Sequence, residues 1–269
     1  MSFATINSRL IKTHAAGLVA LLFTVFGGFS QETNIIDHSE APIVRAERIF
    51  HEAQAQLSTN NTPSDLNWHF GQACFDWAEY ASNDTQRAEV ANLGIAACRA
   101  LIAIQSNSAP AHYFLGMDLG ELAQTKWLGA LSIVSEMERE FKTARRLDEK
   151  FDFAGPDRNL GLLYHEAPSF GSIGDQGKAK TFLEAAVQIA PDYPENRLNL
   201  IEAYLKWSDR VAARRLLDAL EAALPDARKQ FTGPEWTASW LDWKQRLAKL
   251  RLSLGQPPKP IQSSRGKNL

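Results

Sequence analysis

Side chains that could support acid–base or metal chemistry are scattered along this sequence of 269 residues. No two of the six histidines are four residues apart, the spacing that places two imidazoles on one helix face; they are found at positions 14, 38, 51, 69, 112 and 165. Residues 170–174 read FGSIG, so the GxSxG spacing of a serine-hydrolase nucleophile is absent around Ser172. We therefore expect no metal ion, no cofactor and no catalytic residue.

The sequence contains two cysteines, Cys74 and Cys98, which excludes a disulfide framework and a four-thiolate zinc site. If residues 65–80 and 84–105 form an antiparallel helical hairpin, the two cysteines lie about 12 Å apart along its axis. A disulfide spans a Cα separation of at most about 7 Å. Two buried free thiols are therefore expected.

Composition excludes several classes of protein. The formal net charge of −2 and the pI near 6.3 argue against a nucleic-acid partner, because such proteins usually carry a clustered basic surface. The hydrophobic fraction of 45% is sufficient for a packed core and argues against disorder of the whole chain.

The first 30 residues have the layout of a secretory signal peptide. They contain no acidic residue, Arg9 and Lys12 precede the apolar run 15–26, and small residues lie three and one positions before Gln31. A membrane anchor is the alternative, but the run is shorter than the roughly 20 residues that span a bilayer. No cysteine lies near the expected cleavage point, so a lipid anchor is not available. We expect a periplasmic or secreted protein with a charge of −4 and no membrane span after cleavage.

The remainder of the chain has the pattern of an all-α protein. Residues 31–41 are polar and are expected to form a disordered spacer. From Pro42 onward, apolar residues recur at three and four positions, and short segments rich in Pro, Gly, Asn and Asp interrupt them. This alternation predicts antiparallel helices of about 10 to 20 residues.

An internal repeat is visible when residues 174–191 are aligned with residues 208–225, at an offset of 34 positions. The two segments share an alanine, a leucine and a final proline, at Ala179, Leu183 and Pro191 and at Ala213, Leu217 and Pro225. Together with the preceding Leu160, Gly161 and Tyr164, this pattern resembles the tetratricopeptide repeat (TPR). The resemblance covers about residues 65–225 and implies stacked helical hairpins, in which Gly161 permits close helix packing and Pro191 and Pro225 end the second helices.

Two weaker units precede these repeats, and Gly71 and Gly116 mark their first helices. The spacings from Gly71 to Gly116 and from Gly116 to Gly161 are both 45 residues, which we assign to lengthened second helices at 84–105 and 126–148. A C-terminal capping helix is expected at about 234–254, because Trp and Leu residues there follow one helix face. The predicted architecture is therefore a TPR-like α-solenoid over residues 42–254, followed by a disordered tail at 255–269.

The first helices of a TPR solenoid line a concave groove, so the resemblance implies a set of groove-facing residues. The candidates for binding a partner, including Phe170 in an inserted loop at 165–173, are Trp68, Gln72, Tyr113, Met117, Arg158, His165, Glu166, Phe170, Glu202 and Lys206. Asp76 and Glu121 occupy similar positions, and solvated helix faces are the alternative for each residue. The loop is either a binding lip or a buttress against the neighbouring helix.

An exported TPR-like chain with long second helices also resembles the T-component proteins of TRAP (tripartite ATP-independent periplasmic) transporters. That resemblance rests on the overall layout and on residues 160–179, and it implies a substrate-binding protein as partner and homo-oligomerisation. The leading hypothesis is a non-catalytic exported scaffold that binds another protein or peptide. The rival hypothesis is an enzyme or small-molecule binder in which Arg158, His165 and Glu166 converge in the groove.

Overall fold

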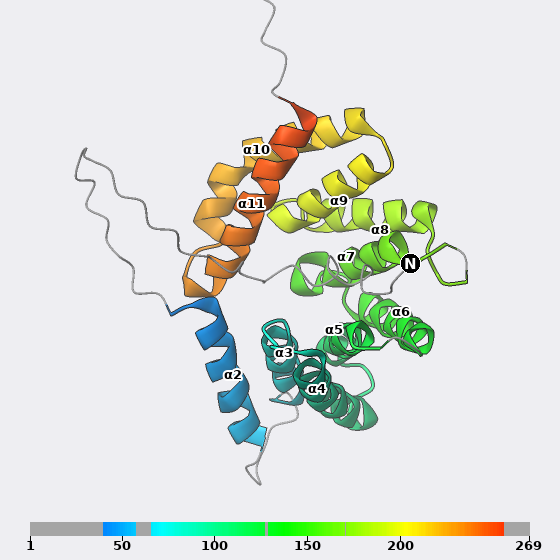
Figure 1. Ribbon diagram of the computed structural model, residues 1–269, viewed down its shortest axis with the longest axis vertical. Coiled ribbons are helices and arrows are strands. Elements are labelled where there is room, and N and C mark those ends of the chain that lie inside the picture. Colours follow the sequence, from blue (N-terminus) through cyan, green and yellow to red (C-terminus); the bar gives the residue numbers. More distant parts are fainter. Residues whose placement is uncertain (1–39, 58–65, 127–128, 170, 256–269) are drawn as a thin grey trace, which may run out of the picture.

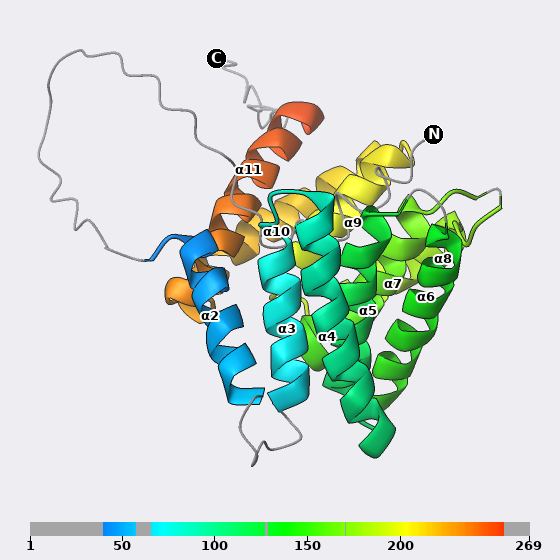
Figure 2. The ribbon, with the colours of Figure 1, turned by 60° about the horizontal axis from the view of Figure 1, so that its bottom comes forward.

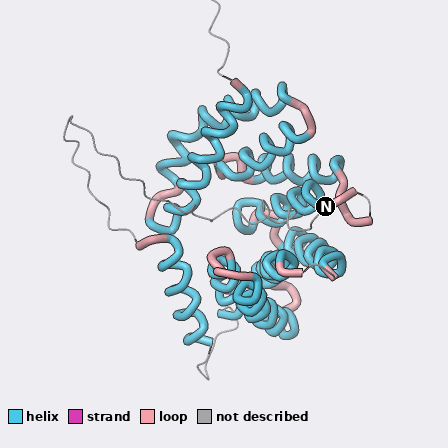
Figure 3. Tube along the Cα trace, viewed as in Figure 1, coloured by secondary structure: helices cyan, strands magenta, loops and turns pink. Residues whose placement is uncertain are grey.

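The structure is a computed structural model, and it describes residues 40–57, 66–126, 129–169 and 171–255. These residues form ten α-helices and one 3-10 turn and contain no strand (Figure 3). The elements are α2 (Pro42–Leu57), α3 (Leu66–Ala78), α4 (Asp84–Ile104), α5 (Ala109–Gln124), α6 (Ala130–Leu147), α7 (Phe151–Glu166), α8 (Gln176–Ile189), α9 (Pro194–Lys206), α10 (Arg210–Gln230), η1 (Pro234–Trp236) and α11 (Thr237–Leu254). Within the described ranges, no helix combines the length and the apolarity needed to cross a bilayer.

Local sequence signals account for where five of the ten described helices begin. The first described helix starts at Pro42, where a proline costs no hydrogen bond because that N–H has no partner in the helix. Four later helices begin after a polar residue whose side chain accepts a backbone N–H of the first turn, namely Asn83, Ser108, Asp175 and Asp209. Three of these caps, Asn83, Ser108 and Asp175, lie in segments that the sequence marks as helix breakers.

The helices pair as antiparallel hairpins that stack into a curved solenoid (Figures 1 and 2). The hairpins are α3–α4, α5–α6, α7–α8 and α9–α10, and the first helices α3, α5, α7, α9 and α11 contact one another in series. Helix α2 packs on α3 at one end of the stack. The predicted all-α solenoid is confirmed.

Three glycines set the close approach of the two helices in the first three hairpins. A Cβ atom at Gly71 would lie 2.4 Å from Cys98 Sγ, and one at Gly116 would lie 2.6 Å from the Phe141 ring. At Gly161 it would lie 2.6 Å from Leu183 Cγ and 2.9 Å from its backbone nitrogen. Each glycine that was predicted to mark a first helix therefore lies where that helix packs against the second helix of its hairpin.

The lengthened second helices are found, with one boundary shifted. Helix α4 spans Asp84–Ile104, close to the predicted 84–105, whereas α6 begins at Ala130 and not at 126. Gly129, in the left-handed region with φ of 84°, precedes α6 and separates it from α5. The extra residues of the repeat that contains Gly116 therefore lie partly in α5 and partly in the segment between α6 and α7.

The prediction that Pro225 ends a helix is wrong, because α10 continues through it to Gln230. Pro225 removes one backbone donor from the helix, but packing beyond it compensates. Ala227 and Phe231 are buried, and the Arg228 guanidinium lies 4.5 Å from the centre of the Trp240 ring. Contact with the C-terminal helix therefore decides where α10 ends.

Helix α11 packs as a cap over the last hairpin. Trp243, Leu247 and Leu250 are buried, and Trp236 and Trp240 pack against the same core. Cys74 and Cys98 are buried free thiols, as predicted. The predicted signal segment, most of the predicted spacer, Phe170 and residues 256–269 of the predicted tail lie outside the described residues.

Candidate functional site

A pocket of about 310 Å³ lies where the two ends of the solenoid approach each other. Its walls come from α2 and α3, from α5 and α7, and from the η1–α11 segment. Figures 1 and 2 both show the start of α2 beside the start of α11. The pocket therefore depends on elements from both ends of the described chain.

The pocket walls are aromatic and apolar, with charged groups between them. The aromatic lining residues are Phe75, Tyr80, Tyr113, Phe114, Tyr193 and Trp236. Three carboxylates, of Asp76, Asp152 and Glu235, and two guanidinium groups, of Arg45 and Arg158, also face the pocket. Such a surface can bury an apolar or aromatic group and also pair with a charge of either sign.

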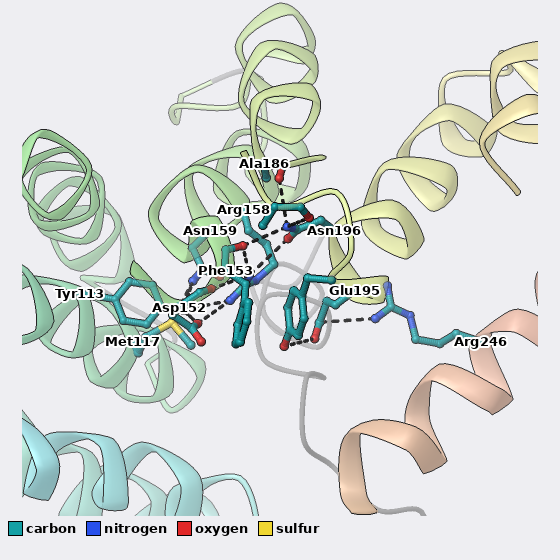
Figure 4. A network of polar contacts seen from close by, with 12 residues as sticks. Tyr113, Met117, Asp152, Phe153, Arg158, Asn159, Ala186, Glu195, Asn196 and Arg246 are labelled. Atoms are coloured by element: carbon teal, nitrogen blue, oxygen red, sulfur yellow. Dashed lines mark hydrogen bonds and ion pairs between the residues drawn. The ribbon is translucent and has the colours of Figure 1, made fainter. Parts of the chain in front are cut away.

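Arg158 is the centre of a buried polar network at the pocket (Figure 4). Its Nη2 donates to Asp152 Oδ2 at 2.5 Å and to Tyr113 Oη at 3.3 Å. The Tyr113 hydroxyl donates to the same Asp152 oxygen at 2.5 Å and accepts from Asn159 Nδ2 at 3.0 Å. Arg158 is only 3% exposed, whereas the Asp152 side chain is 35% exposed and remains open to a ligand.

The network holds a strained backbone turn at the start of α7. Asp152, Phe153 and Ala154 have φ values of 48°, 54° and 64°, a left-handed conformation that costs about 1 to 2 kcal/mol for each L-residue. Arg158 Nη1 donates to the carbonyl oxygens of Asp152 and Phe153, and Asn196 Nδ2 donates to that of Phe153 at 2.9 Å. These bonds satisfy carbonyl groups that the left-handed turn points away from the helix.

Burial fixes the protonation of the two pocket tyrosines at the network. Burial raises the pKa of Tyr113 well above its ordinary value, and the charge of Asp152 raises it further. Burial likewise raises the pKa of Tyr193, and the charge of Glu195 adds to the effect. Both phenols therefore stay protonated at neutral pH, and Tyr113 acts as a donor to Asp152.

The network extends from the pocket to the capping helix. The Tyr193 hydroxyl donates to Glu195 Oε2 at 3.3 Å, and Arg246 Nη1 of α11 lies 3.5 Å from Glu195 Oε1. Arg246 also pairs with Glu202 through Nε, at 3.0 Å. Figure 4 shows the polar residues that extend from Tyr113 on α5 to Arg246 on α11, so the pocket lining and the cap are parts of one polar assembly.

The described residues offer no site for a resident metal ion. Within the ranges given above, no three His, Cys, Asp or Glu side chains come together in a way that could hold one.

Comparison with known proteins identifies the repeat. The sequence model of the tetratricopeptide repeat family matches residues 174–231, which contain α8, α9 and α10. Residues 174–231 of this chain therefore match the tetratricopeptide repeat. No curated protein sequence matches it.

Solved structures of TPR proteins are similar to this chain. The crystal structure of TTC0263, a thermophilic TPR protein in Thermus thermophilus, has a TM-score of 0.55 and 18% identity, covering 77% of this chain and 91% of that one. The structure of yeast Tom70 has a TM-score of 0.28 and 11% identity, covering 91% of this chain and 70% of that one, and supports no argument. The likeness to TTC0263 supports the fold alone.

Four of the candidate residues predicted from the TPR register line the pocket: Gln72, Tyr113, Met117 and Arg158. Trp68 lies nearby but outside the lining, where its ring stacks on Phe114 at 5.8 Å. Asp76 also lines the pocket, whereas Glu121 is buried against Arg87. The first helices of three successive TPR units therefore contribute to one site.

The remaining candidates lie elsewhere in the TPR solenoid. Lys206 Nζ is 3.3 Å from Glu166 Oε2, and His165 Nε2 is 3.4 Å from Glu166 Oε1. Glu202 pairs with Arg246 of the cap. The structure thus does not bring Arg158 together with His165 and Glu166, because those two residues do not line the pocket that Arg158 occupies.

The inserted loop folds back on the end of α7. Gly174 N donates to Pro168 O at 3.1 Å and Asp175 N donates to Tyr164 O at 3.0 Å. Ile173 is half-buried against the core, while Phe170 is outside the described residues. Asp157 is buried within α7 and accepts from Arg145 Nε at 2.8 Å.

Several residues of the pocket lining were not predicted from the sequence, including Arg45, Asp152, Asn159 and Tyr193. Arg45 precedes the repeats, so the TPR register assigns it no role. Asp152 and Tyr193 lie at helix boundaries, where the helical period gives no direction for a side chain. Only Asn159, which follows Arg158 on α7, could have been proposed from its place beside a predicted site residue.

Proposed function

We propose that this protein is a non-catalytic exported scaffold that binds a segment of another protein in the pocket between α2, the first TPR helices and α11. The single observation that carries the proposal is the lining of the pocket: aromatic walls surround the half-exposed Asp152 and the guanidinium of Arg45. Aromatic residues, methionine and arginine are enriched at the centres of protein interfaces, and the lining contains all three kinds, with Met117 and Arg45 beside the aromatic walls.

The size of the pocket limits what can enter it. A volume of about 310 Å³ is at the lower end of the range for small-molecule sites and suits one or two anchoring side chains of a peptide. The rest of the partner would then lie along α2 and α11 at the pocket entrance. A small polar molecule is the second candidate ligand, because the Asp152–Arg158 network supplies both charges inside the pocket.

Gln72 offers a test that leaves the fold intact. Gln72 is half-buried on α3 and lines the pocket, so the longer side chain of Gln72→Arg would project into it. Gln176→Arg, at an exposed position on α8, is the matched control. The chain from Gln31 would be used to capture proteins from the periplasmic extract of its native host, and circular dichroism would confirm that both variants fold.

The proposal predicts that the wild type and Gln176→Arg retain the same protein and that Gln72→Arg loses it. Retention by Gln72→Arg would place the interface elsewhere. A wild type that retains no protein but carries a bound metabolite in native mass spectrometry would favour the small-molecule candidate.

We also propose that the partner is the substrate-binding protein of a TRAP-type uptake system. The support is the sequence layout: a signal-like segment at 1–30, long TPR-like units, and the residues at 160–179. Co-purification of the chain with such a protein supports this narrower proposal, and capture of an unrelated partner contradicts it. Light scattering of the purified chain tests self-association independently.

A further inference from the structure

The first turn of α10 and the last turn of α11 meet at one edge of the solenoid, at the top of Figure 1. Arg210 Nη2 donates to Ser253 O at 2.8 Å, and Arg214 Nη2 donates to Leu254 O at 2.5 Å. These bonds join the two helix ends directly. We call residues 210–215 and 249–254 the basic tip.

Two aliphatic side chains protrude from the basic tip. Val211 is 83% exposed and Leu252 is 85% exposed, the two highest values among the large apolar residues exposed on the described surface. Neither contributes to the core, so the fold gains nothing from them at these positions. A contact outside the molecule would remove both from water.

The charges around these side chains are of one sign. The basic tip contains five Lys and Arg residues and no Asp or Glu: Arg210, Arg214, Arg215, Lys249 and Arg251. Two acids adjoin it: Asp209 caps α10 by accepting from Ala212 N, and Glu221 pairs with Arg251 at 2.5 Å. In contrast, residues 31–206 hold 25 acids and 15 Lys and Arg residues, so the positive charge is concentrated at this end.

We propose that the basic tip docks the protein on an anionic membrane surface, with Val211 and Leu252 entering the headgroup layer. Cations around exposed apolar side chains match such a surface, because anionic lipids attract the cations while the apolar groups leave water. The two side chains lie in the first turn of α10 and the last turn of α11, and both are more than four-fifths exposed. Fluid lipid closes around a protruding side chain, whereas a protein partner would need a matching cavity.

Docking at the basic tip leaves the pocket accessible. Ala238, near the start of α11, lines the pocket, and Leu252 lies 14 residues later on the same helix, about 21 Å away along its axis. The inference therefore does not depend on what binds in the pocket. Docking through the basic tip would hold the pocket at a fixed distance from the lipid surface.

Vesicle co-sedimentation tests this inference. The chain from Gln31 includes every described helix and omits the apolar run 15–26, which could bind lipid by itself. Vesicles of 30% phosphatidylglycerol in phosphatidylcholine would be compared with pure phosphatidylcholine, at low and high NaCl. We expect at least about tenfold tighter binding to the anionic vesicles, lost at high salt because exposed charges are then screened.

Two double variants locate the contact. Arg215→Glu/Lys249→Glu should weaken binding to anionic vesicles by more than about tenfold, since each cation near the surface is worth about fivefold. Val211→Asp/Leu252→Asp should also weaken it. The controls are Arg139→Glu/Arg146→Glu on α6 and Ile104→Asp, an apolar position 75% exposed at the end of α4, and both should bind like the wild type.

Equal binding to both kinds of vesicle would overturn the inference. Unchanged binding by both tip variants would overturn it as well, because another basic segment would then make the contact. Capture of an acidic protein through the same residues, without binding to vesicles, would assign the basic tip to a protein partner and also contradict the proposal.

Discussion

Arg158 binds both the side chain and the backbone of Asp152. Its Nη2 donates to the carboxylate at 2.5 Å and its Nη1 donates to the carbonyl oxygen at 3.1 Å. The same guanidinium lies 5.2 Å from the centre of the Tyr193 ring. One side chain therefore fixes the left-handed turn, the pocket acid and the beginning of the next TPR unit.

Replacement of Arg158 should destabilise the protein strongly. Arg158→Met leaves the carbonyl groups of the turn and the Asp152 carboxylate without this donor, and we expect a loss of about 3 kcal/mol in the free energy of unfolding. Urea denaturation measures the loss. Arg139→Met, at an exposed position on α6, is the control and should change stability by less than about 0.5 kcal/mol. Equal stabilities of the two variants would contradict a structural role for the network.

The close approach of α7 and α8 makes Gly161 intolerant of a side chain. Gly161→Ala should cost about 1 to 3 kcal/mol, since the new methyl group meets both the side chain and the backbone of Leu183. Thermal unfolding provides the measurement. Gly177→Ala, on an exposed face of α8, should be neutral or stabilising because alanine favours a helix. A Gly161→Ala protein as stable as the wild type would show that the helices can separate at little cost.

The two thiols should be unreactive in the folded protein. Burial raises the pKa of Cys74 and of Cys98 well above the ordinary value, and the charge of Asp118 adds to the effect at both. A thiol reagent such as DTNB should therefore label neither cysteine until urea unfolds the chain. Mass spectrometry after air oxidation gives a second readout, and a peptide cross-linked through Cys74 and Cys98 would refute the prediction.

Glu121 should make stability fall as the pH rises. Burial raises its pKa from 4.5 to about 7, despite the opposing charge of Arg87. The folded state then holds a proton that the unfolded state releases, so unfolding becomes easier between about pH 4.5 and pH 7, by about 3 kcal/mol in total. Glu121→Gln removes this titration. The difference in unfolding free energy between wild type and variant should therefore change across that interval, and a constant difference would contradict the prediction.

The helices and their register could be predicted from the sequence. The helical period, the caps at Asn83 and Asp175 and the glycines at the hairpin contacts are local signals that act over a few residues. Pro225 is a local signal for the end of a helix, but α10 continues beyond it because Ala227 and Phe231 are buried. Cys74 and Cys98 are the predicted buried free thiols, but the predicted offset of about 12 Å is wrong, because Cys98 Sγ lies beside Gly71, three residues from Cys74 on α3.

The sequence by itself determined an all-α chain of stacked hairpins and several of the residues on the inner helices. Only the tertiary structure decided that Tyr113, Arg158 and Asp152 form one network, and that His165 and Glu166 lie outside it. The curvature of a solenoid is the sum of small rotations between repeats, so it brings α2 and α11 to one pocket through contacts distant in the sequence. The left-handed turn at 152–154 likewise exists because Arg158 and Asn196 stabilise it, since no local preference of Phe153 or Ala154 favours it.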